Sequence, residues 1–376
     1  MSKHDRLRTW AWVHKWSSLV CTLFLLILCV TGLPLIFHDE IESLLGETQA
    51  PAMPADTPRA SLDRVAAAAR AYYPGQVIQF LSWDPDEPHL VFAGMNRSLD
   101  APPSTRKSLV LDDRTAKVLD APDRQSGFLY LMLQIHTDLF AGLPGKLFLG
   151  AMGLLFVAAI VSGVVLYRPF MRKLAFGTVR RERSPRIKWL DLHNLLGIAA
   201  LVWIFVVGVT GVINTLSDLM VVAWQKGQLA EMVAPYAHAP LPTAFSSIEQ
   251  AVRTAERAAP DMTPQFIGFP GTRFTSPHHY AVFMHGNTPL TSRLLMPALI
   301  DAQTGKLTDM RAMPWYVQTL FLSEPLHFGD YGGLPLKLLW TACAWLTLFI
   351  TGNGAWLWWS RRRRKRRPEA AAEGAA

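Results

Sequence analysis

The chain has 376 residues, 50% of them hydrophobic, and a formal net charge of +8. Its long apolar runs exclude an ordinary soluble domain, and because basic residues cluster beside these runs, the positive charge reports membrane topology and not nucleic-acid binding. The three cysteines, Cys21, Cys29 and Cys343, lie inside apolar runs, so the sequence predicts no disulfide framework.

Four apolar segments have about the 20 residues needed to cross a bilayer. In chain order they are 16–37, 147–167, 195–217 and 338–360. The first is long for the core of a signal peptide and no clear cleavage site follows it, so we interpret it as an uncleaved anchor. The sequence therefore predicts a membrane α-helical protein with a four-transmembrane-helix bundle.

Basic residues orient these predicted spans. Just over half of the 37 lysines and arginines fall in residues 1–15, 168–188 and 361–367, and the positive-inside rule places such segments in the cytoplasm. The arginine run after the last span is interpreted as a stop-transfer anchor in preference to a nucleic-acid or lipid site. The predicted order is 1–38 (N-terminus and first span), 39–146 (external module), 147–168 (span), 169–190 (basic cytoplasmic loop), 191–218 (span), 219–337 (external module), 338–360 (span) and 361–376 (basic tail).

The chain also repeats itself. "WVHKWSSLV" (12–20) matches "DLHNLLGIA" (191–199), "SLDRVAAAARAYYPG" (61–75) matches "SIEQAVRTAERAAPD" (247–261), and "LDDRTAKV" (111–118) matches "IDAQTGKL" (300–307). "HTDLFAGLPGK" (136–146) likewise matches "HFGDYGGLPLK" (327–337). Features recurring in one order predict a duplicated unit of span, external module and span. Each external module combines a 3.6-periodic helix with alternating strands, which predicts a small α+β fold.

The turn signature "DDRTAK" and "DAQTGK" resembles that of the PepSY domain, and its place between spans resembles the PepSY-associated transmembrane family. The histidine-bearing segments are most similar to the inner-membrane ferrisiderophore reductases of this family, the ferrioxamine-type reductases among them. The resemblance implies two b-type haems, a ferric siderophore as periplasmic substrate and release of iron as Fe(II). It also implies residence in the bacterial inner membrane, with electrons coming from the cytoplasm or the quinol pool.

Four of the eleven histidines occupy repeated positions. His14 and His193 open the first and third spans, and His136 and His327 precede the second and fourth at equal distance. Two pairs at two depths are what bis-histidine haem iron requires, so these four are the predicted axial ligands. A Ser/Thr-Gly pair stands at the other end of each span and is expected to leave room for the edge of a macrocycle. The glycines are Gly32, Gly163, Gly211 and Gly352.

Alternatives remain open at several places. His38 competes as an external ligand, and His278, His279 and His285 are interpreted as a surface cluster with at most weak metal affinity. Asp138 is expected to be a solvated interfacial carboxylate. No nucleophile elbow, phosphate loop or zinc motif is present, so no catalytic side chain is predicted. Two other functions stay possible: a haem-free PepSY regulatory or sensory protein, and an iron or siderophore transporter.

Overall fold

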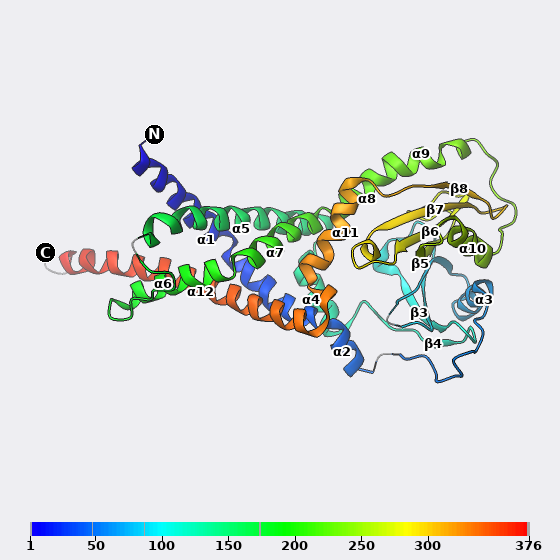
Figure 1. Cartoon of the computed structure of the whole chain (residues 1–376), viewed down its shortest axis with the longest axis horizontal. Helices are drawn as coiled ribbons and strands as arrows, with labels where there is room; N and C mark the ends of the chain where they lie inside the picture. Colours follow the sequence, from blue (N-terminus) through cyan, green and yellow to red (C-terminus); the bar gives the residue numbers. More distant parts are fainter. Residues whose placement is uncertain (1, 47, 86, 173, 374–376) are drawn as a thin grey trace. The chain divides into compact units, whose positions relative to one another are not determined.

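The computed structural model describes residues 2–46, 48–85, 87–172 and 174–373 (Figure 1). They form two compact units, each assembled from separate parts of the chain. The helical unit contains Met1–His38, Leu131–Ser217 and Ser323–Ala376, and the sheet unit contains Asp39–Tyr130 and Asp218–Leu322.

The helical unit is built from five long helices and the ends of two shorter ones. Helix α1 packs against α5 and α12, α5 packs against α7, and α6 packs against α12. The long helices are α1 (Lys3–Ile36), α5 (Gly142–Met171), α6 (Pro185–Ala199), α7 (Leu201–Thr215) and α12 (Gly333–Glu373). The shorter helices are α4 (Gly127–Thr137) and α11 (Trp315–Phe328).

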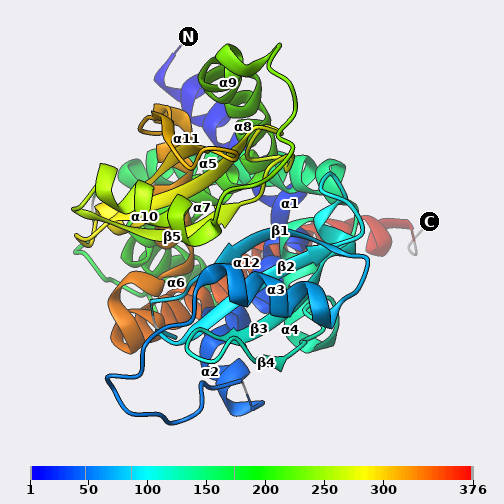
Figure 2. The same ribbon diagram turned by 90° about the vertical axis from the view of Figure 1, so that its right-hand side faces the viewer.

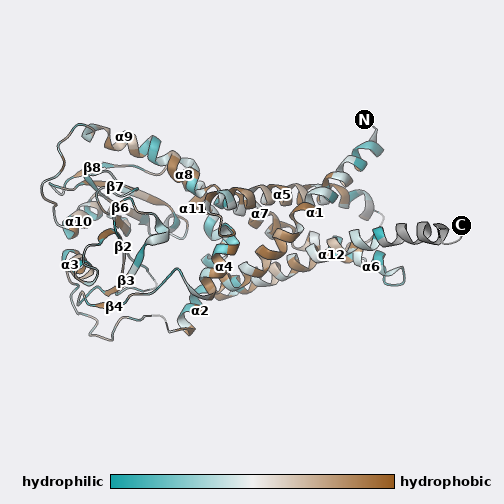
Figure 3. Ribbon diagram, turned by 180° about the vertical axis from the view of Figure 1, so that it is seen from behind, coloured by the Kyte–Doolittle hydropathy of each residue, from teal (hydrophilic) through white to brown (hydrophobic). Residues whose placement is uncertain are grey.

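Three segments are long and apolar enough to cross a membrane, namely His4–Ile36, Gly142–Pro169 and Asp330–Arg362. Hydrophobic colour runs along α1, α5 and α7 in Figure 3. The predicted third span is divided between α6 and α7, which are bent by 68°, and the pair makes a fourth span if it is counted as one broken span. The bend lies at Ala200, whose backbone N–H still donates to Leu196 O. Helix α12 continues to Glu373, and residues 374–376 of the predicted tail lie outside the described residues.

The sheet unit contains eight antiparallel strands in the order β4-β3-β2-β1-β5-β6-β7-β8. Because β1 pairs with β5, the strands of the two predicted modules share one sheet. The strands are β1 (Val77–Ser82), β2 (Leu90–Asn96), β3 (Lys107–Asp112), β4 (Val118–Asp120), β5 (Met262–Gly268), β6 (His279–Gly286), β7 (Leu295–Asp301) and β8 (Leu307–Met310).

Helices α3 (Leu62–Tyr72) and α10 (Ile248–Ala258) cover one face of this sheet (Figure 2). Their apolar sides share one core with residues of both strand groups, including Leu81 and Ile267. The two helices also cap each other. Asp63 Oδ1 accepts from the N–H of Ile248 at 2.8 Å, and Glu249 Oε2 accepts from the N–H of Leu62 at 3.2 Å. Each carboxylate thus satisfies an orphan donor at the other helix's N-terminus.

The opposite face is covered over β6 and β7 by α8 (Ser217–Trp224), α9 (Ala230–Val233) and the start of α11. Trp224 is 2% exposed and its ring lies 6.1 Å from that of Phe283. The remaining short helices are α2 (His38–Leu44), a π-helix (Gln225–Leu229) and 3₁₀ turns at Pro103–Thr105, Ala234–Tyr236, Thr291–Arg293 and Asp330–Gly332.

The repeated D-x-x-T-[GA]-K segments form tight turns in both strand groups. Asp112 Oδ1 accepts from the N–H of Thr115 at 2.9 Å, and Asp301 Oδ1 accepts from the N–H of Thr304 at 2.7 Å. The next residue has positive φ in each copy, 58° at Ala116 and 68° at Gly305. The aspartate therefore stabilises a turn that the backbone alone disfavours.

Candidate functional site

The four predicted histidines come together in two pairs within the helical unit. The ring centroids of His14 and His193 lie 6.4 Å apart with their planes at 76°, and those of His136 and His327 lie 6.2 Å apart at 61°. Each pair joins two different helices, α1 with α6 and α4 with α11.

These spacings match imidazoles bound on opposite sides of one metal ion. With metal–nitrogen bonds of about 2.0 Å, two such rings have centroids roughly 6.3 Å apart. The described residues contain no group of three or more His, Cys, Asp and Glu side chains that could hold a metal. A metal between either pair therefore needs further ligands from a bound group, and the four in-plane nitrogens of a porphyrin fit that requirement.

The Nδ1 atoms of two of the histidines bind backbone carbonyls of the neighbouring helix. His14 Nδ1 lies 2.9 Å from Ala159 O, and His327 Nδ1 lies 3.1 Å from Val207 O. A carbonyl can only accept, so Nδ1 carries the proton and Nε2 keeps the lone pair. Metal-binding histidines are held in this way, with the second nitrogen donating to a fixed acceptor.

Hydroxyl groups lie beside three of the four imidazoles, and one of these imidazoles, that of His136, also has a backbone hydrogen bond to Leu28. Thr31 Oγ1 lies 3.0 Å from His136 Nδ1, and its own proton goes to Ile27 O at 2.8 Å. The threonine oxygen is thereby left to accept from the imidazole. Thr210 and Ser162 repeat the arrangement, each donating within its own helix and lying 3.3 Å from Nδ1 of His327 and His14, respectively.

His193 departs from this pattern. Its Nδ1 is buried and faces the carbonyl of Ile350, four residues before Gly354, but no described residue meets ordinary hydrogen-bond geometry with it. Asn353 occupies the place that Ser or Thr has in the other three copies, and its Nδ2 donates to Trp189 O at 2.9 Å. The Oδ1 of Asn353 is also buried and has no hydrogen-bond partner among the described residues. The second acceptor is therefore missing at one histidine of four.

A glycine directly follows each of the four residues in these positions and makes room for a histidine ring. The four residues are Thr31, Ser162, Thr210 and Asn353. A β-carbon at these glycines would approach the Cε1 atom of the opposing imidazole. The distances are 2.9 Å for Gly32 to His136, 3.0 Å for Gly211 to His327, 3.2 Å for Gly163 to His14 and 3.4 Å for Gly354 to His193. The glycine beside the fourth histidine is thus Gly354, whereas the predicted Ser/Thr-Gly pair ends at Gly352, where a β-carbon would meet nothing within 4 Å.

Three of these pairs were predicted from the sequence, but their contact with imidazoles was not. Their role beside a macrocycle stays a prediction, and in the structure they lie against the imidazoles of the neighbouring helix. The acceptor carbonyls carry no signal of their own in the sequence. Their only trace is position, since Ala159 and Val207 each lie four residues before the glycine of the same helix.

Other predicted candidates lie apart from the two pairs. His38 is exposed and its Nδ1 binds Leu35 O at 3.0 Å within its own chain segment. His279 is not on the surface as expected, because the start of β6 buries it completely and Ser276 Oγ lies 2.7 Å from its Nδ1. Asp138 is also buried, at 9% exposure, and accepts from the N–H of Phe140 in the turn after α4.

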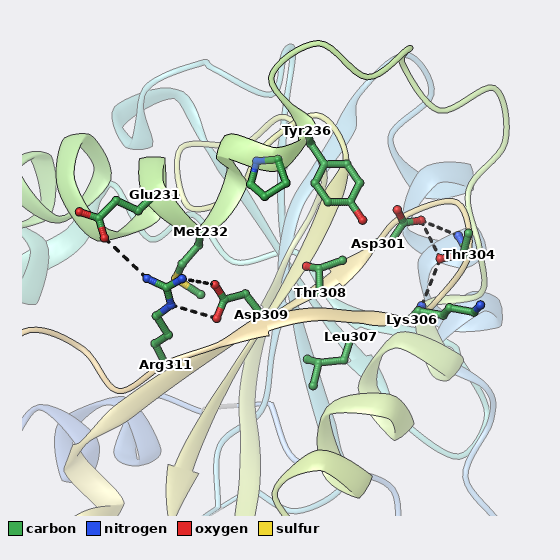
Figure 4. A pocket seen from close by; sticks show the side chains of 11 residues that line it. Glu231, Met232, Tyr236, Asp301, Thr304, Lys306, Leu307, Thr308, Asp309 and Arg311 are labelled. Carbon is green, nitrogen blue, oxygen red and sulfur yellow. Dashed lines mark hydrogen bonds and ion pairs between the residues drawn. The ribbon is translucent and has the colours of Figure 1, made fainter.

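A pocket of about 470 Å³ opens in the sheet unit beside Tyr236 and β8 (Figure 4). Its charged side chains bind one another, with Arg311 2.7 Å from Asp309 and 3.6 Å from Glu231. Asp301 binds Thr304 in the turn described above. These contacts account for most of the pocket's charge, so it offers a weaker candidate site than the histidine pairs.

Residues 11–361 match the family described as "PepSY-associated TM region". The chain belongs to this PepSY-associated family. The match covers both histidine pairs, so the site lies within the family's region. A Pseudomonas aeruginosa protein, "Uncharacterized protein PA4219", is 35% identical over 91 residues, which is 24% of this chain and 23% of that protein. The chain therefore matches only about a quarter of this relative's length, and the printed name assigns no activity.

Proposed function

We propose that this PepSY-associated protein is an inner-membrane reductase that holds two b-type haems and passes electrons to a ferric siderophore in the periplasm. The observation that supports this most is the 6.4 Å and 6.2 Å spacing of the two imidazole pairs. His14 and His193 would bind one haem iron, and His136 and His327 the other. Bound haem supplies one-electron chemistry by cycling between Fe(III) and Fe(II).

Helix α1 supports transfer across the membrane, because it carries a member of one pair and the platform for the other. His14 and Gly32 are 18 residues apart on one uninterrupted helix, which is about 27 Å at 1.5 Å per residue. Since Gly32 contacts His136, the two pairs belong to opposite ends of a membrane-spanning helix.

The proposed direction follows from the basic segments. Both termini and the 169–190 loop would be cytoplasmic, and the two halves of the chain would be copies of one duplicated unit. An electron from a quinol or a cytoplasmic flavoprotein would enter at the His14 and His193 end. It would leave at the His136 and His327 end to one ferric chelate. Reduction releases the metal, since hard oxygen ligands bind Fe(II) much less tightly than Fe(III).

Absorption spectra of the purified full-length protein, oxidised and dithionite-reduced, test this proposal. We expect a low-spin b-type spectrum and close to two haems per chain. A colourless preparation that stays colourless after haem is added would overturn the haem assignment and favour the haem-free regulatory or sensory function. Reoxidation of the reduced protein by a ferric chelate, with an Fe(II) indicator present, then tests the reductase step.

The bend at Ala200 favours a transporter as the second candidate, because broken helices often line transport sites. Its backbone hydrogen bonds continue through the break, however, with Ile204 N–H donating to Ala200 O at 2.9 Å. Proteoliposomes loaded without reductant distinguish the two functions. Uptake of a radiolabelled Ga(III) chelate, which cannot be reduced in this range, would support transport and contradict the reductase.

A further inference from the structure

Three arginines of the sheet unit lie over phenylalanine rings. A guanidinium group over an aromatic face is a favourable cation–π arrangement. It also leaves the edge of the guanidinium free to bind another group. The pairs are Arg106 over Phe80 at 4.8 Å, Arg124 over Phe92 at 5.6 Å and Arg273 over Phe274 at 4.7 Å.

Strand register places these rings on one face of the sheet. Paired residues of antiparallel strands project to the same side. One row of paired residues is Gly94, Phe80 and Gly268, and the next is Phe92, Ser82 and Phe266. Phe274 packs against this second row, with its ring 6.1 Å from Phe266. The neighbouring residues of the strands, such as Leu81 and Ala93, enter the core beneath α3 and α10, so the arginine-bearing face is the opposite one.

The Phe80 ring lies against Gly94 of β2, which has no side chain. A β-carbon at Gly94 would overlap the Phe80 ring, and one at Gly268 would stand 3.8 Å from Phe274 Cβ. Gly94 therefore lets the Phe80 ring lie close to the backbone of β2. Gly268 leaves room for Thr275, whose Cγ2 would lie 3.3 Å from a β-carbon there, in the segment that carries Arg273 and Phe274.

The arginines have no carboxylate partner among the described residues. Arg106 Nε donates to Gln79 Oε1 at 3.0 Å, and Asp123, which precedes Arg124 in the chain, accepts from the N–H of Gln125. Burial and the positive charge of Arg273 lower the pKa of Arg106. Like charges held together without an acid are unfavourable until an anion binds, which is the condition of an anion-binding surface.

We propose that Arg106, Arg124 and Arg273 bind the ferric chelate, and that this chelate is an anion whose iron is held by aromatic oxygens, either phenolate or catecholate. Guanidinium groups bind such oxygens through charge-assisted hydrogen bonds, and the phenylalanines offer flat apolar surface to aryl rings. This inference rests on the proposed function and names its substrate class. An uncharged or cationic hydroxamate chelate gains nothing from three positive charges.

Binding of Ga(III) chelates to the full-length protein in detergent tests the inference without electron transfer. The probes are a trianionic hexadentate tris(catecholate) and an uncharged hexadentate tris(hydroxamate), measured by isothermal titration calorimetry. We expect the catecholate to bind at least tenfold more tightly and to lose affinity as salt is raised. Arg273→Gln and Arg124→Gln should each weaken it roughly tenfold, since charge-assisted hydrogen bonds are lost.

The matched control is Arg64→Gln, an exposed arginine on α3 at the other face of the sheet, which should leave affinity unchanged. Arg106→Gln is a third variant, with its fold checked by circular dichroism because Gln79 loses a partner. Equal affinity for both chelates, or equal loss in the control, would overturn the inference. So would complete competition by soluble short-chain phosphatidylglycerol without any preference for the chelate, which would assign the surface to lipid headgroups. Absorption spectra of the same samples separate this result from a failure of haem binding.

Discussion

The ring of His136 lies against Gly32 so closely that a β-carbon at Gly32 would stand 2.9 Å from Cε1 of the histidine. Gly32→Ala should therefore displace the imidazole, at a cost of about 1–3 kcal/mol for overpacking. We expect haem content to fall toward half of the wild-type value. Gly227→Ala is the control, because a β-carbon there meets nothing within 4 Å and the residue lies in the sheet unit. Pyridine haemochrome assays compare the two, and equal haem content in both variants would contradict the role given to Gly32.

Replacing single histidines tests whether the two pairs bind haem and whether His38 is a ligand in their place. His136→Ala or His327→Ala should each remove about one haem of two, since an axial ligand is lost, and His14→Ala or His193→Ala should remove the other. His38→Ala should leave both, because His38 is exposed and binds Leu35 O. Loss of haem in the His38 variant, with retention in the His136 variant, would move the external site to the first span.

The hydroxyl acceptor beside His136 gives a prediction about affinity. Thr31→Val keeps the shape of the side chain but removes the oxygen that lies 3.0 Å from Nδ1. Loss of such a partner typically weakens metal binding about 10–100-fold, so the variant should release haem faster to apomyoglobin. Thr137→Val is matched to it, because Thr137 follows His136 and its hydroxyl donates to Leu133 O within α4. Identical release rates would show that the threonine is not part of the site.

The reciprocal capping of α3 and α10 predicts an effect confined to the sheet unit. Asp63→Ala removes the acceptor for the N–H of Ile248 and for Ser247 Oγ, and loss of an N-terminal cap costs about 1–2 kcal/mol. Hydrogen–deuterium exchange should become faster in α10, while the helical unit stays unchanged. Glu256→Ala, an exposed site on the same helix, should be neutral. Uniform acceleration through both units would instead indicate global destabilisation.

His279 predicts a loss of stability in mild acid. Burial lowers its pKa to about 4, opposed by the charge of Asp301 and assisted by His278. Between its ordinary pKa near 6.5 and pH 4, the imidazole is protonated in the unfolded chain and neutral in the folded chain. The free energy of unfolding therefore falls by about 2–3 kcal/mol as the pH is lowered over that window. His279→Gln should be less stable at pH 7 and should lose less on acidification. Urea unfolding followed by tryptophan fluorescence measures both, and parallel slopes for the two proteins would refute the assignment.

Much of the fold was accessible from the sequence, because long apolar runs and repeated segments are local signals. The bend at Ala200 was not, since the residues on both sides are apolar and no proline marks the break. The β1–β5 pairing was also missed. It joins Leu81 to Ile267, far apart in the chain, and no local pattern encodes such a partner.

The histidine pairs were predicted because imidazoles at repeated positions are a rare pattern. Their surroundings were not, since carbonyls such as Ala159 O have no residue-type signature and become visible only when two helices pack. Gly354 illustrates the limit. Asn353 replaces the hydroxyl residue there, so the Thr-Gly motif at 351–352 does not reveal that Gly354 is the glycine beside His193.

Helix α1 places His14 and Gly32 on one rigid rod. Thinner or thicker lipids change the tilt of such a rod and not its length. The distance along α1 between the two imidazole pairs is thus set by the number of residues between His14 and Gly32, and it stays constant in membranes of different composition. One residue inserted between them would turn the far end by about 100° and carry Gly32 away from His136. Within α1, length is therefore under tighter constraint than the identity of the apolar residues that fill it.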